Sequence, residues 1–578
     1  MLPSYHRLPA APWLGGYGAA SLRQDVIAGL IVVMMLVPQS LAYALLAGLP
    51  AEAGLFASIL PLIAYALFGT SRALAVGPVA VISLMTASAL APLATPGSAA
   101  YAALALELAA LSGIFLFACG VLRLGVLSHL LSHPVINGFM AGSAVLIMLG
   151  QLMPLLGLRG RGQTGGALLQ ALITQWPHTN GATATLGGMA LLLLALAGRW
   201  VKPLGRLAGL RDSTAALLVK LVPMLVVAGA IIATVTLDLD HRYGVAVVGQ
   251  LPTGLPAWHW PAFELETTKQ LLLPAGAMAL VGFIESISVA QSIAMRERER
   301  IFPNRELLGL GAANLAAACT GGLPVTGGLS RSIVNQAAGA RSPIAGVVVA
   351  GLLALIVSLA GNLFERLPTS VLAASIIVPM ARLLDFRGIA ATWRYRATDG
   401  LAQVATAAGV LVLGVEPGIA IGVVFSLLAL VWAASQPHIA VLGRVPGTEQ
   451  YRNVLRASVE TTPEIIALRV DENLFFGNID AVEQAIHTAL ANQPGARHVL
   501  LVLSSVSHID ATALERLLAI NDGLGAQGIA LHFAEVKGPV HDRLLRSPLP
   551  GALRGGVFRF THEAFKHLTA HDASTPRT

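Results

Sequence analysis

The sequence predicts a polytopic α-helical membrane protein that ends in a small α/β domain. Of its 578 residues, 55% are hydrophobic and 12% are charged, which is about half the charged share of an ordinary soluble domain. The deficit is uneven, because charged residues make up 26 of the 134 residues after Arg444 but only 41 of the first 444. We therefore expect two domains, a membrane domain over residues 1–443 and a soluble domain over residues 444–578.

Long uncharged stretches recur through the first domain. A spanning helix needs about 20 apolar residues, and division of these stretches at proline and glycine clusters predicts about 12 to 14 spans. The first stretch, Val26–Ala51, has no charged residue and is long enough to span, so we interpret it as a retained helix and not as a cleaved signal peptide.

The distribution of Lys and Arg predicts the orientation of the spans. If there are fourteen spans and the N-terminus is inside, about 18 basic residues fall in cytoplasmic loops and about 5 in external ones. This bias predicts a multi-pass protein of the inner (plasma) membrane with both termini in the cytoplasm. It also accounts for the net charge of +7, so we expect no nucleic-acid partner.

Two apolar segments at comparable places in the two halves are interrupted by glycine and proline. Leu74–Ser83 contains Gly77-Pro78, and Gly321–Ser332 contains Pro324 and two Gly-Gly pairs. Such breaks are tolerated at membrane depth only where protein or a water-filled cavity satisfies the freed backbone groups. A matched pair of broken helices is the best sequence indication of a transport site between inverted repeats.

The start of each broken helix offers groups that bind anions. Free N–H groups and the helix dipole place about half a positive charge at a helix N-terminus. Ser330 and Ser332 would add hydroxyl donors and Arg331 a full charge, although serines also cap helices and an arginine can reach an interface. The backbone positions that we expect to contact an anion are Val79, Ala80, Gly328 and Leu329.

Glu285 is an isolated acid in the otherwise apolar segment Leu271–Ala294. A carboxyl group at that depth is costly unless it is paired or protonated. We therefore expect Glu285 to exchange a proton and to couple proton flow to anion entry, with no other cofactor. Two alternatives remain open: a purely structural pairing of Glu285 with Arg331, and Glu107 as the proton carrier.

Polar groups also interrupt the first predicted helix. Pro38 predicts a kink, beside which Gln39 and Tyr43 present side chains that can donate to an oxyanion. A helix–helix hydrogen bond is the alternative role for Gln39. No catalytic constellation is evident, and Cys119 and Cys319 fit no metal or disulfide spacing. We therefore expect neither an enzyme nor a metal site.

The C-terminal part alternates between strand and helix patterns. Ile465–Val470, His498–Leu503 and Ile529–Ala534 are continuous apolar runs typical of buried strands. Asp480–Asn492 and Ala511–Leu524, which lie between them, have helical spacing. The alternation predicts a small α/β domain.

Several of these segments also resemble the SulP sulfate permeases, which are called solute carrier family 26 in animals. The segments are Asp25–Gly29, Val37–Ala44, Gly48–Pro50, Tyr65–Arg72, Val76–Pro78 and Leu329–Asn335. Ile509-Asp510 followed by a helix resembles the STAS domain that these proteins carry. The resemblance implies fourteen spans in two inverted repeats of seven, core and gate domains, elevator-type alternating access and homodimers. It further implies that the third and tenth helices hold the anion and that the STAS domain binds a cytoplasmic partner or a nucleotide.

The coupling ion and the substrate follow only partly from the resemblance. Sodium-coupled bicarbonate members carry Asp at the position of Glu285 and Thr at about Val289. This chain has neither, so we expect proton-coupled symport of a sulfate-like or bicarbonate-like anion. An uncoupled anion channel or exchanger and a C4-dicarboxylate transporter of the same fold are the alternatives.

Overall fold

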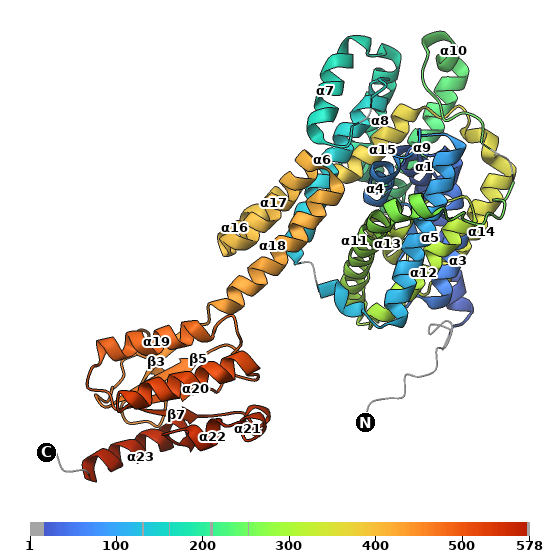
Figure 1. The fold of residues 1–578 in the computed structure, drawn as a ribbon. Coiled ribbons are helices and arrows are strands. Elements are labelled where there is room, and N and C mark those ends of the chain that lie inside the picture. The colour runs from blue at the N-terminus through green and yellow to red at the C-terminus, as the bar shows by residue number, and fades with distance from the viewer. Residues whose placement is uncertain (1–16, 130–131, 161, 208–211, 252–253, 575–578) are drawn as a thin grey trace. The chain divides into compact units, whose positions relative to one another are not determined.

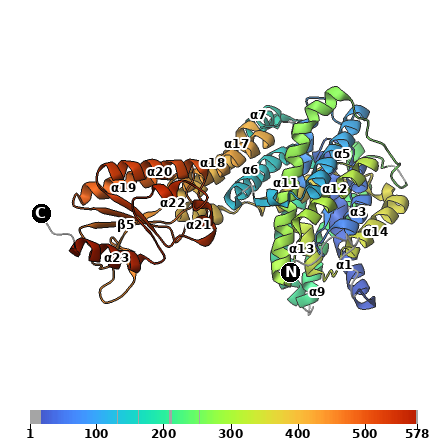
Figure 2. The ribbon, with the colours of Figure 1, turned by 60° about the horizontal axis from the view of Figure 1, so that its bottom comes forward.

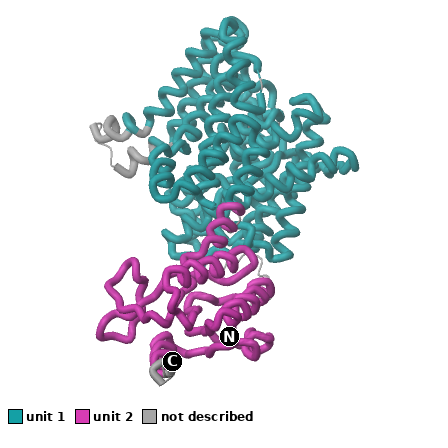
Figure 3. Tube along the Cα trace, turned by 60° about the vertical axis from the view of Figure 1, so that its left-hand side comes forward, with its two compact units in different colours: residues 1–426 teal, residues 427–578 magenta. Residues whose placement is uncertain are grey.

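The computed structural model describes residues 17–129, 132–160, 162–207, 212–251 and 254–574. The chain divides into two compact units between Ser426 and Leu427, within helix α18 (Figure 3). The first unit contains the apolar helices and the second contains a six-stranded sheet.

The apolar helices of the described residues fall into two sets of seven in chain order. The first set comprises α1 (Ala19–Leu46), α2 with α3 (Ala51–Phe56 and Leu60–Phe68), α4 (Ala80–Leu90), α5 (Ala99–Val121), α6 (His133–Leu155), α8 (Gly181–Leu207) and α9 (Asp212–Leu237). The second comprises α11 (Leu265–Glu297), α12 (Pro303–Cys319), α13 (Leu329–Ala337), α14 (Ile344–Ala360), α15 (Thr369–Ala381), α17 (Ala397–Leu413) and α18 (Val415–Ser435). The third member of each set, α4 or α13, is short and follows a two-residue strand, as expected for inverted repeats with broken helices.

These helices pack as two bundles (Figure 1). The core bundle contains α1–α5 and α11–α14, and α5 lies against both α11 and α12 within it. The gate bundle contains α6, α8, α9, α15 and α17, and α6 packs against α15 and α17. Helices α1 and α4 of the core bundle contact the gate bundle.

Two buried carboxylates join the two halves of the core bundle. Glu306 at the start of α12 accepts hydrogen bonds from the Tyr65 hydroxyl and the Thr70 N–H, each 2.7 Å long. Asp25 in α1 accepts a 2.6 Å hydrogen bond from the Ser342 hydroxyl at the turn before α14. Both acids are fully buried, and an unpaired charge there would be costly. The two contacts explain why acids occupy these helix starts.

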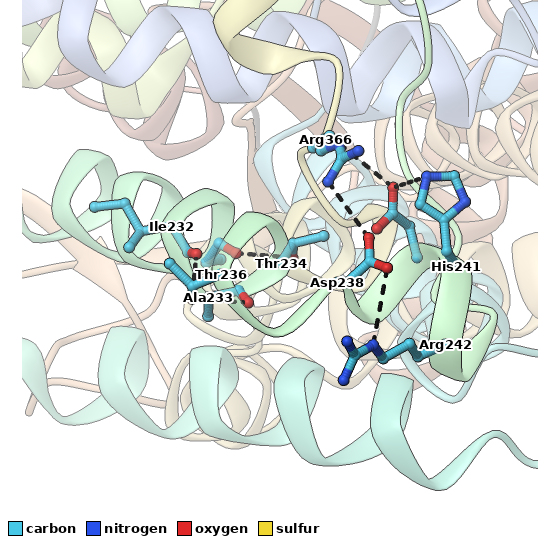
Figure 4. A network of polar contacts seen from close by, with 10 residues as sticks. Ile232, Ala233, Thr234, Thr236, Asp238, His241, Arg242 and Arg366 are labelled. Atoms are coloured by element: carbon cyan, nitrogen blue, oxygen red, sulfur yellow. Dashed lines mark hydrogen bonds and ion pairs between the residues drawn. The ribbon is translucent and has the colours of Figure 1, made fainter.

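Two of the connections between the core bundle and the gate bundle are joined to each other by backbone hydrogen bonds. Residues 245–249, which follow the short helix α10 (Leu239–Tyr243), lie beside residues 365–369, which lead into α15. Val248 N–H donates to the Leu367 carbonyl at 2.9 Å. Figure 4 shows Arg366 of the second connection beside Asp238. The Arg366 guanidinium lies 3.6 Å from a carboxylate oxygen of Asp238 and 3.6 Å from one of Asp240. Two of the chain crossings between the bundles are therefore joined to each other.

The second unit is an α/β domain whose strand order is β4-β3-β5-β6-β7-β8. Its strands are β3 (Ile439–Arg444), β4 (Tyr451–Asn453), β5 (Ile465–Val470), β6 (His498–Val502), β7 (Ala530–Ala534) and β8 (Val557–Phe558). Strands β5 to β8 are parallel, whereas β3 and β4 form an antiparallel edge.

Helices cover both faces of this sheet (Figure 2). Helices α19 (Ile479–Asn492) and α20 (Ala511–Ala526) bury apolar side chains against one face. Helix α23 (Thr561–Ser574) packs Phe565 and Leu568 on the other face. The remaining short helices are α21 (Gly538–Leu544) and α22 (Leu549–Ala552). The three predicted strands and two predicted helices are present, and the edge strands, β8 and α21–α23 are additional.

Candidate functional site

Two very short strands cross at the centre of the first unit. Strand β1 (Val76–Gly77) pairs antiparallel with β2 (Thr326–Gly327). Helix α4 begins at Ala80 directly after β1, and α13 begins at Leu329 directly after β2. Neither helix has a side-chain cap at its N-terminus, so the first-turn N–H groups of both helices remain available to a ligand.

Arg331 lies where the two strands cross. Its side chain is buried, with 2% exposure, and a Cβ atom at Gly328 would lie 2.9 Å from its Nε and Nη2 atoms. Gly77 has a φ of +156°, and a Cβ atom there would lie 3.0 Å from Arg331 Nη1. Only glycine allows the guanidinium to approach the backbone this closely. Nη1 and Nη2 have no hydrogen-bond partner among the described residues, so they can bind an anion.

A set of hydroxyl groups fastens β2 to α11. The Ser286 hydroxyl accepts from Gly327 N–H at 2.8 Å and lies 2.7 Å from Thr326 Oγ1. Thr326 in turn donates to the Gly282 carbonyl at 2.6 Å. Since Ser286 follows Glu285 in α11, this network fixes the position of the Glu285 backbone relative to the start of α13.

Ser332 has a structural role that the sequence did not predict. Its hydroxyl accepts from Ala75 N–H at 2.9 Å and donates to the Gly328 carbonyl at 2.7 Å. The side chain is fully buried and does not line the central cavity. The prediction that Ser332 presents a donor to the anion was therefore wrong: its hydroxyl joins the start of α13 to the segment before β1.

A cavity of about 470 Å³ opens at the N-termini of α4 and α13. Nine of the side chains or backbone positions that the sequence singled out line it, and Ser332 and Glu107 do not. The nine are Gln39, Tyr43, Val79, Ala80, Glu285, Gly328, Leu329, Ser330 and Arg331. The other lining residues are mostly apolar and come from both bundles. The structure thus gathers the candidate residues around one space.

Helix α1 contributes the residues around Pro38 to the cavity. Pro38 lies inside the helix, which continues from Ala19 to Leu46, and Gln39 and Tyr43, which are 8% and 6% exposed, line the cavity one turn apart. Neither side chain makes a hydrogen bond to another described residue. The helix–helix hydrogen bond considered for Gln39 is therefore not formed, and both polar groups can reach a bound anion.

Glu285 lines the same cavity without contacting Arg331 directly. No ion pair of 4.0 Å or less joins the two, and Glu285 Oε2 has no hydrogen-bond partner among the described residues. The alternative acid, Glu107, is instead buried against α11, where Thr267 and Thr268 donate hydrogen bonds to it. Its carboxylate does not line the cavity, which favours Glu285 as the group that communicates with a ligand.

Sequence reasoning missed the wall that the gate bundle supplies. Met140 of α6, Ser375 of α15 and Arg382 at the end of α15 all line the cavity. Arg382 makes no ion pair with another described residue. Nothing in the sequence marks these residues, because α6 and α15 are apolar spans and Arg382 resembles an ordinary loop arginine. Glu285, Arg331 and Arg382 are the charged lining residues among those described.

One cluster outside the cavity has the composition of a metal site. Side-chain ligand atoms of Asp238, Asp240 and His241 lie within 4.8 Å of one another. Arg366 contacts both carboxylates, and Arg242 lies 3.9 Å from Asp238. These cations already balance the acidic charge, so the cluster is explained by ion pairing.

The fold and the cavity define a membrane transporter built from two inverted repeats. Residues 22–406 match the Sulfate permease family, and residues 456–563 match the STAS domain. The chain belongs to the sulfate permease (SulP) family, whose animal members form solute carrier family 26. It is accordingly a transporter and not an enzyme.

Relatives and solved structures agree with this assignment. A probable sulfate transporter of Mycobacterium tuberculosis is 33% identical over 95% of this chain and 96% of its own. Sulfate transporter 4.1 of Arabidopsis chloroplasts is 32% identical over 98% and 82%. The murine solute carrier 26 member A9 anion transporter, in its inward-facing state, superposes with a TM-score of 0.86 at 22% identity, over 97% of this chain and 94% of its own. The transmembrane domain of a cyanobacterial bicarbonate transporter gives 0.58 at 22% identity, over 72% and 98%. The fourteen-span fold with a C-terminal STAS domain is thereby confirmed.

Proposed function

We propose that this protein is a proton-coupled symporter of a small inorganic anion, with sulfate the first candidate and bicarbonate the second. The observation that carries the proposal is the cavity itself. In it the uncapped N-termini of α4 and α13, the unpartnered guanidinium of Arg331 and the carboxyl group of Glu285 face one space.

The electrostatics of the cavity favour a divalent or monovalent oxyanion. Each helix N-terminus contributes about half a positive charge, and Arg331 contributes a full one in surroundings that are mostly apolar. Charge-assisted hydrogen bonds are strong in such a medium. The hydroxyl groups of Ser330 and Tyr43 and the amide of Gln39 complete a set of donors that matches an oxyanion.

Glu285 provides the coupling in this proposal. When it is ionised, its charge cancels that of Arg331 and repels the anion; when it is protonated, the cavity is positive. Loading of the anion together with one proton is therefore favoured over loading of either alone. The proton would be the coupling ion, and no further cofactor is needed.

Alternating access follows from the division of the cavity wall. The core bundle carries α4, α13 and Glu285, whereas α6, α8, α9 and α15 of the gate bundle form the opposite wall. Movement of the core bundle along the gate bundle would carry the anion across the membrane as an elevator. Similarity to the inward-facing murine relative supports an inward-facing state here, with both termini in the cytoplasm of the inner (plasma) membrane.

The assembly and the C-terminal unit are part of the same proposal. We expect a homodimer in which the gate bundles are fixed and the core bundles move. The STAS domain would bind a cytoplasmic partner or a nucleotide and regulate the rate of transport. It has its own hydrophobic cores on both faces of the sheet and contributes no residue to the cavity.

A transport assay tests the proposal. The purified protein in liposomes is given labelled sulfate, bicarbonate, chloride and succinate, each with and without an inward proton gradient. We expect uptake of sulfate or bicarbonate to accelerate with the gradient, and replacement of Ser330 by Leu to abolish uptake of the transported anion. Equal uptake with and without the gradient would support an uncoupled channel or exchanger.

A C4-dicarboxylate transporter is the second candidate, because of the second arginine. Arg331 and Arg382 line the same cavity, so one molecule with two carboxylates has two cations to bind. Preferred uptake of succinate, lost in Arg382→Gln, would favour this alternative over an inorganic anion.

A further inference from the structure

Helix α16 (Phe386–Tyr395) connects two spans of the gate bundle and has no buried residue. It follows α15 and precedes α17, both of which are apolar. Three aromatic side chains are exposed: Phe386 by 71%, Trp393 by 47% and Tyr395 by 91%. A short connection between two spans must lie at the membrane surface, where exposed aromatic rings are stable.

The residues of α16 separate into two stripes. Phe386, Ile389, Ala390 and Trp393 recur at the spacing of one helix face. Arg387 and Arg394, which are seven residues apart, share a position beside that face. A helix with an apolar face flanked by arginines is typical of one that lies in the plane of the membrane interface.

The arginines of this segment are unpaired. Arg387, Arg394 and Arg396 are all exposed, and none forms an ion pair with a described residue, although surface arginines elsewhere in the chain do. Asp385 is engaged as the N-cap of α16, where it accepts from Gly388 N–H at 2.9 Å. These three exposed positive charges have no ion-pair partner among the described residues and are available to anions from outside the chain.

The packing of α16 against α17 fixes the position of α16 at the end of the span. A Cβ atom at Gly400 of α17 would lie 2.5 Å from the Trp393 ring, so the two helices meet at a close corner that only glycine permits. Helix α17 runs through the membrane from this corner. The arginine stripe is therefore held next to the start of α17.

We propose that α16 is a binding surface for anionic phospholipid headgroups. The three arginines bind the headgroup phosphates and the apolar stripe rests among the upper acyl chains. Charge complementarity selects anionic over zwitterionic lipid, because each arginine near an anionic surface contributes about fivefold to binding. The contact anchors the gate bundle to the bilayer, against which the core bundle can move.

The test uses the full-length protein in phosphatidylcholine vesicles that contain a minority of phosphatidylglycerol. Electron paramagnetic resonance with spin-labelled lipids gives the relative association of each lipid with the protein. We expect the wild type to prefer phosphatidylglycerol about fivefold or more at low salt, with the preference falling as salt is added. In Arg387→Gln/Arg394→Gln/Arg396→Gln the preference should fall at least severalfold.

A matched control removes the same charge elsewhere. Arg543, Arg546 and Arg559 are exposed in the C-terminal unit, and their triple replacement by Gln should leave the lipid preference unchanged. An unchanged preference in the α16 variant, or an equal loss in both variants, would overturn the proposal. If the α16 triple variant does not enter vesicles, the three single variants are measured in its place. Each should lower the preference for phosphatidylglycerol by part of the amount expected for the triple variant.

Discussion

At the scale of single residues, the central feature is a buried guanidinium with free donors. Arg331 is held between Gly77 and Gly328 at the strand crossing, and its Nη atoms have no partner among the described residues. A buried cation in this condition costs folding free energy unless a ligand or a nearby acid balances it. This arrangement is expected at a binding site and not in a purely structural core.

Replacement of Arg331 should weaken binding more than folding. Each hydrogen bond to a charged group contributes about 1.5–3 kcal/mol, so Arg331→Gln should lower anion affinity by about 10- to 100-fold. Arg331→Lys should recover only part of this, because an ammonium cannot offer two parallel donors. Calorimetric titration of the purified protein with sulfate measures the change. If Arg331→Gln bound sulfate with the affinity of the wild type, the guanidinium would not be a ligand of the anion.

At the scale of elements, the site depends on the network that fastens β2. Ser286 connects α11 with both Thr326 and the Gly327 N–H. Its removal leaves the buried Gly327 N–H without an acceptor, a cost of about 1–3 kcal/mol. Since the same network positions the start of α13 beside Glu285, its loss should affect transport as well as stability.

The prediction compares two serines on one helix. Ser286→Ala should lower the thermal unfolding midpoint and reduce the uptake rate severalfold. Ser288→Ala is the matched control, because the Ser288 hydroxyl bonds only to the Ile284 carbonyl of its own helix. Midpoint and uptake are measured on both variants and the wild type. The same small effect for both variants would show that the connection to β2 contributes neither to stability nor to uptake.

In the STAS domain, strands β6 and β7 contain a pair of histidines, of which His532 is buried and His498 is half-buried. His532 Nδ1 accepts from Gly556 N–H at 2.9 Å, and its Nε2 lies 3.1 Å from His498 Nδ1. Burial, and then repulsion from protonated His498 and His567, lower the pKa of His532 from 6.5 to about 4. Between these values the unfolded state binds the proton more readily, so stability falls as pH decreases through that window.

The histidine pair therefore predicts an acid-sensitive sheet. A pKa shift of this size corresponds to about 3 kcal/mol, lost between about pH 6.5 and pH 4. Hydrogen exchange of the β6 and β7 amides in the full-length protein, corrected for intrinsic rates, should show the loss, and His532→Gln should weaken its pH dependence. Identical profiles for the two proteins would assign the acid sensitivity to other groups.

The sequence predicts those elements whose pattern is local. Gly77-Pro78 and Gly328 interrupt apolar runs, so the broken helices and their residues are visible, and Ile465–Val470 is a continuous apolar run that forms β5. The gate wall is not visible, because Met140 and Ser375 reach the cavity only through packing of distant helices. The role of Ser332 was predicted wrongly for the same reason: its hydrogen-bond partner, the Ala75 N–H, is 257 residues away.

At the scale of the whole molecule, the core bundle contains the candidate anion-binding groups and the gate bundle provides the surface that faces them. The core bundle contains both uncapped helix N-termini and Glu285, and the gate bundle supplies most of the apolar wall. The paired connections 245–249 and 365–369 limit where the bundles can bend. In the proposed mechanism, a carrier that moves one charged site past an apolar wall requires that the charge of the loaded site be small, and protonation of Glu285 would lower that charge.

The measurement that tests this account most directly is the initial rate of sulfate uptake against external pH, for the wild type and for Glu285→Gln in liposomes with a fixed internal pH. The glutamine resembles the protonated acid, so the variant should still bind sulfate. We expect wild-type uptake to rise as the external pH is lowered and the uptake by Glu285→Gln to be independent of it. Two curves with the same pH dependence would contradict the proposed role of Glu285 in proton coupling.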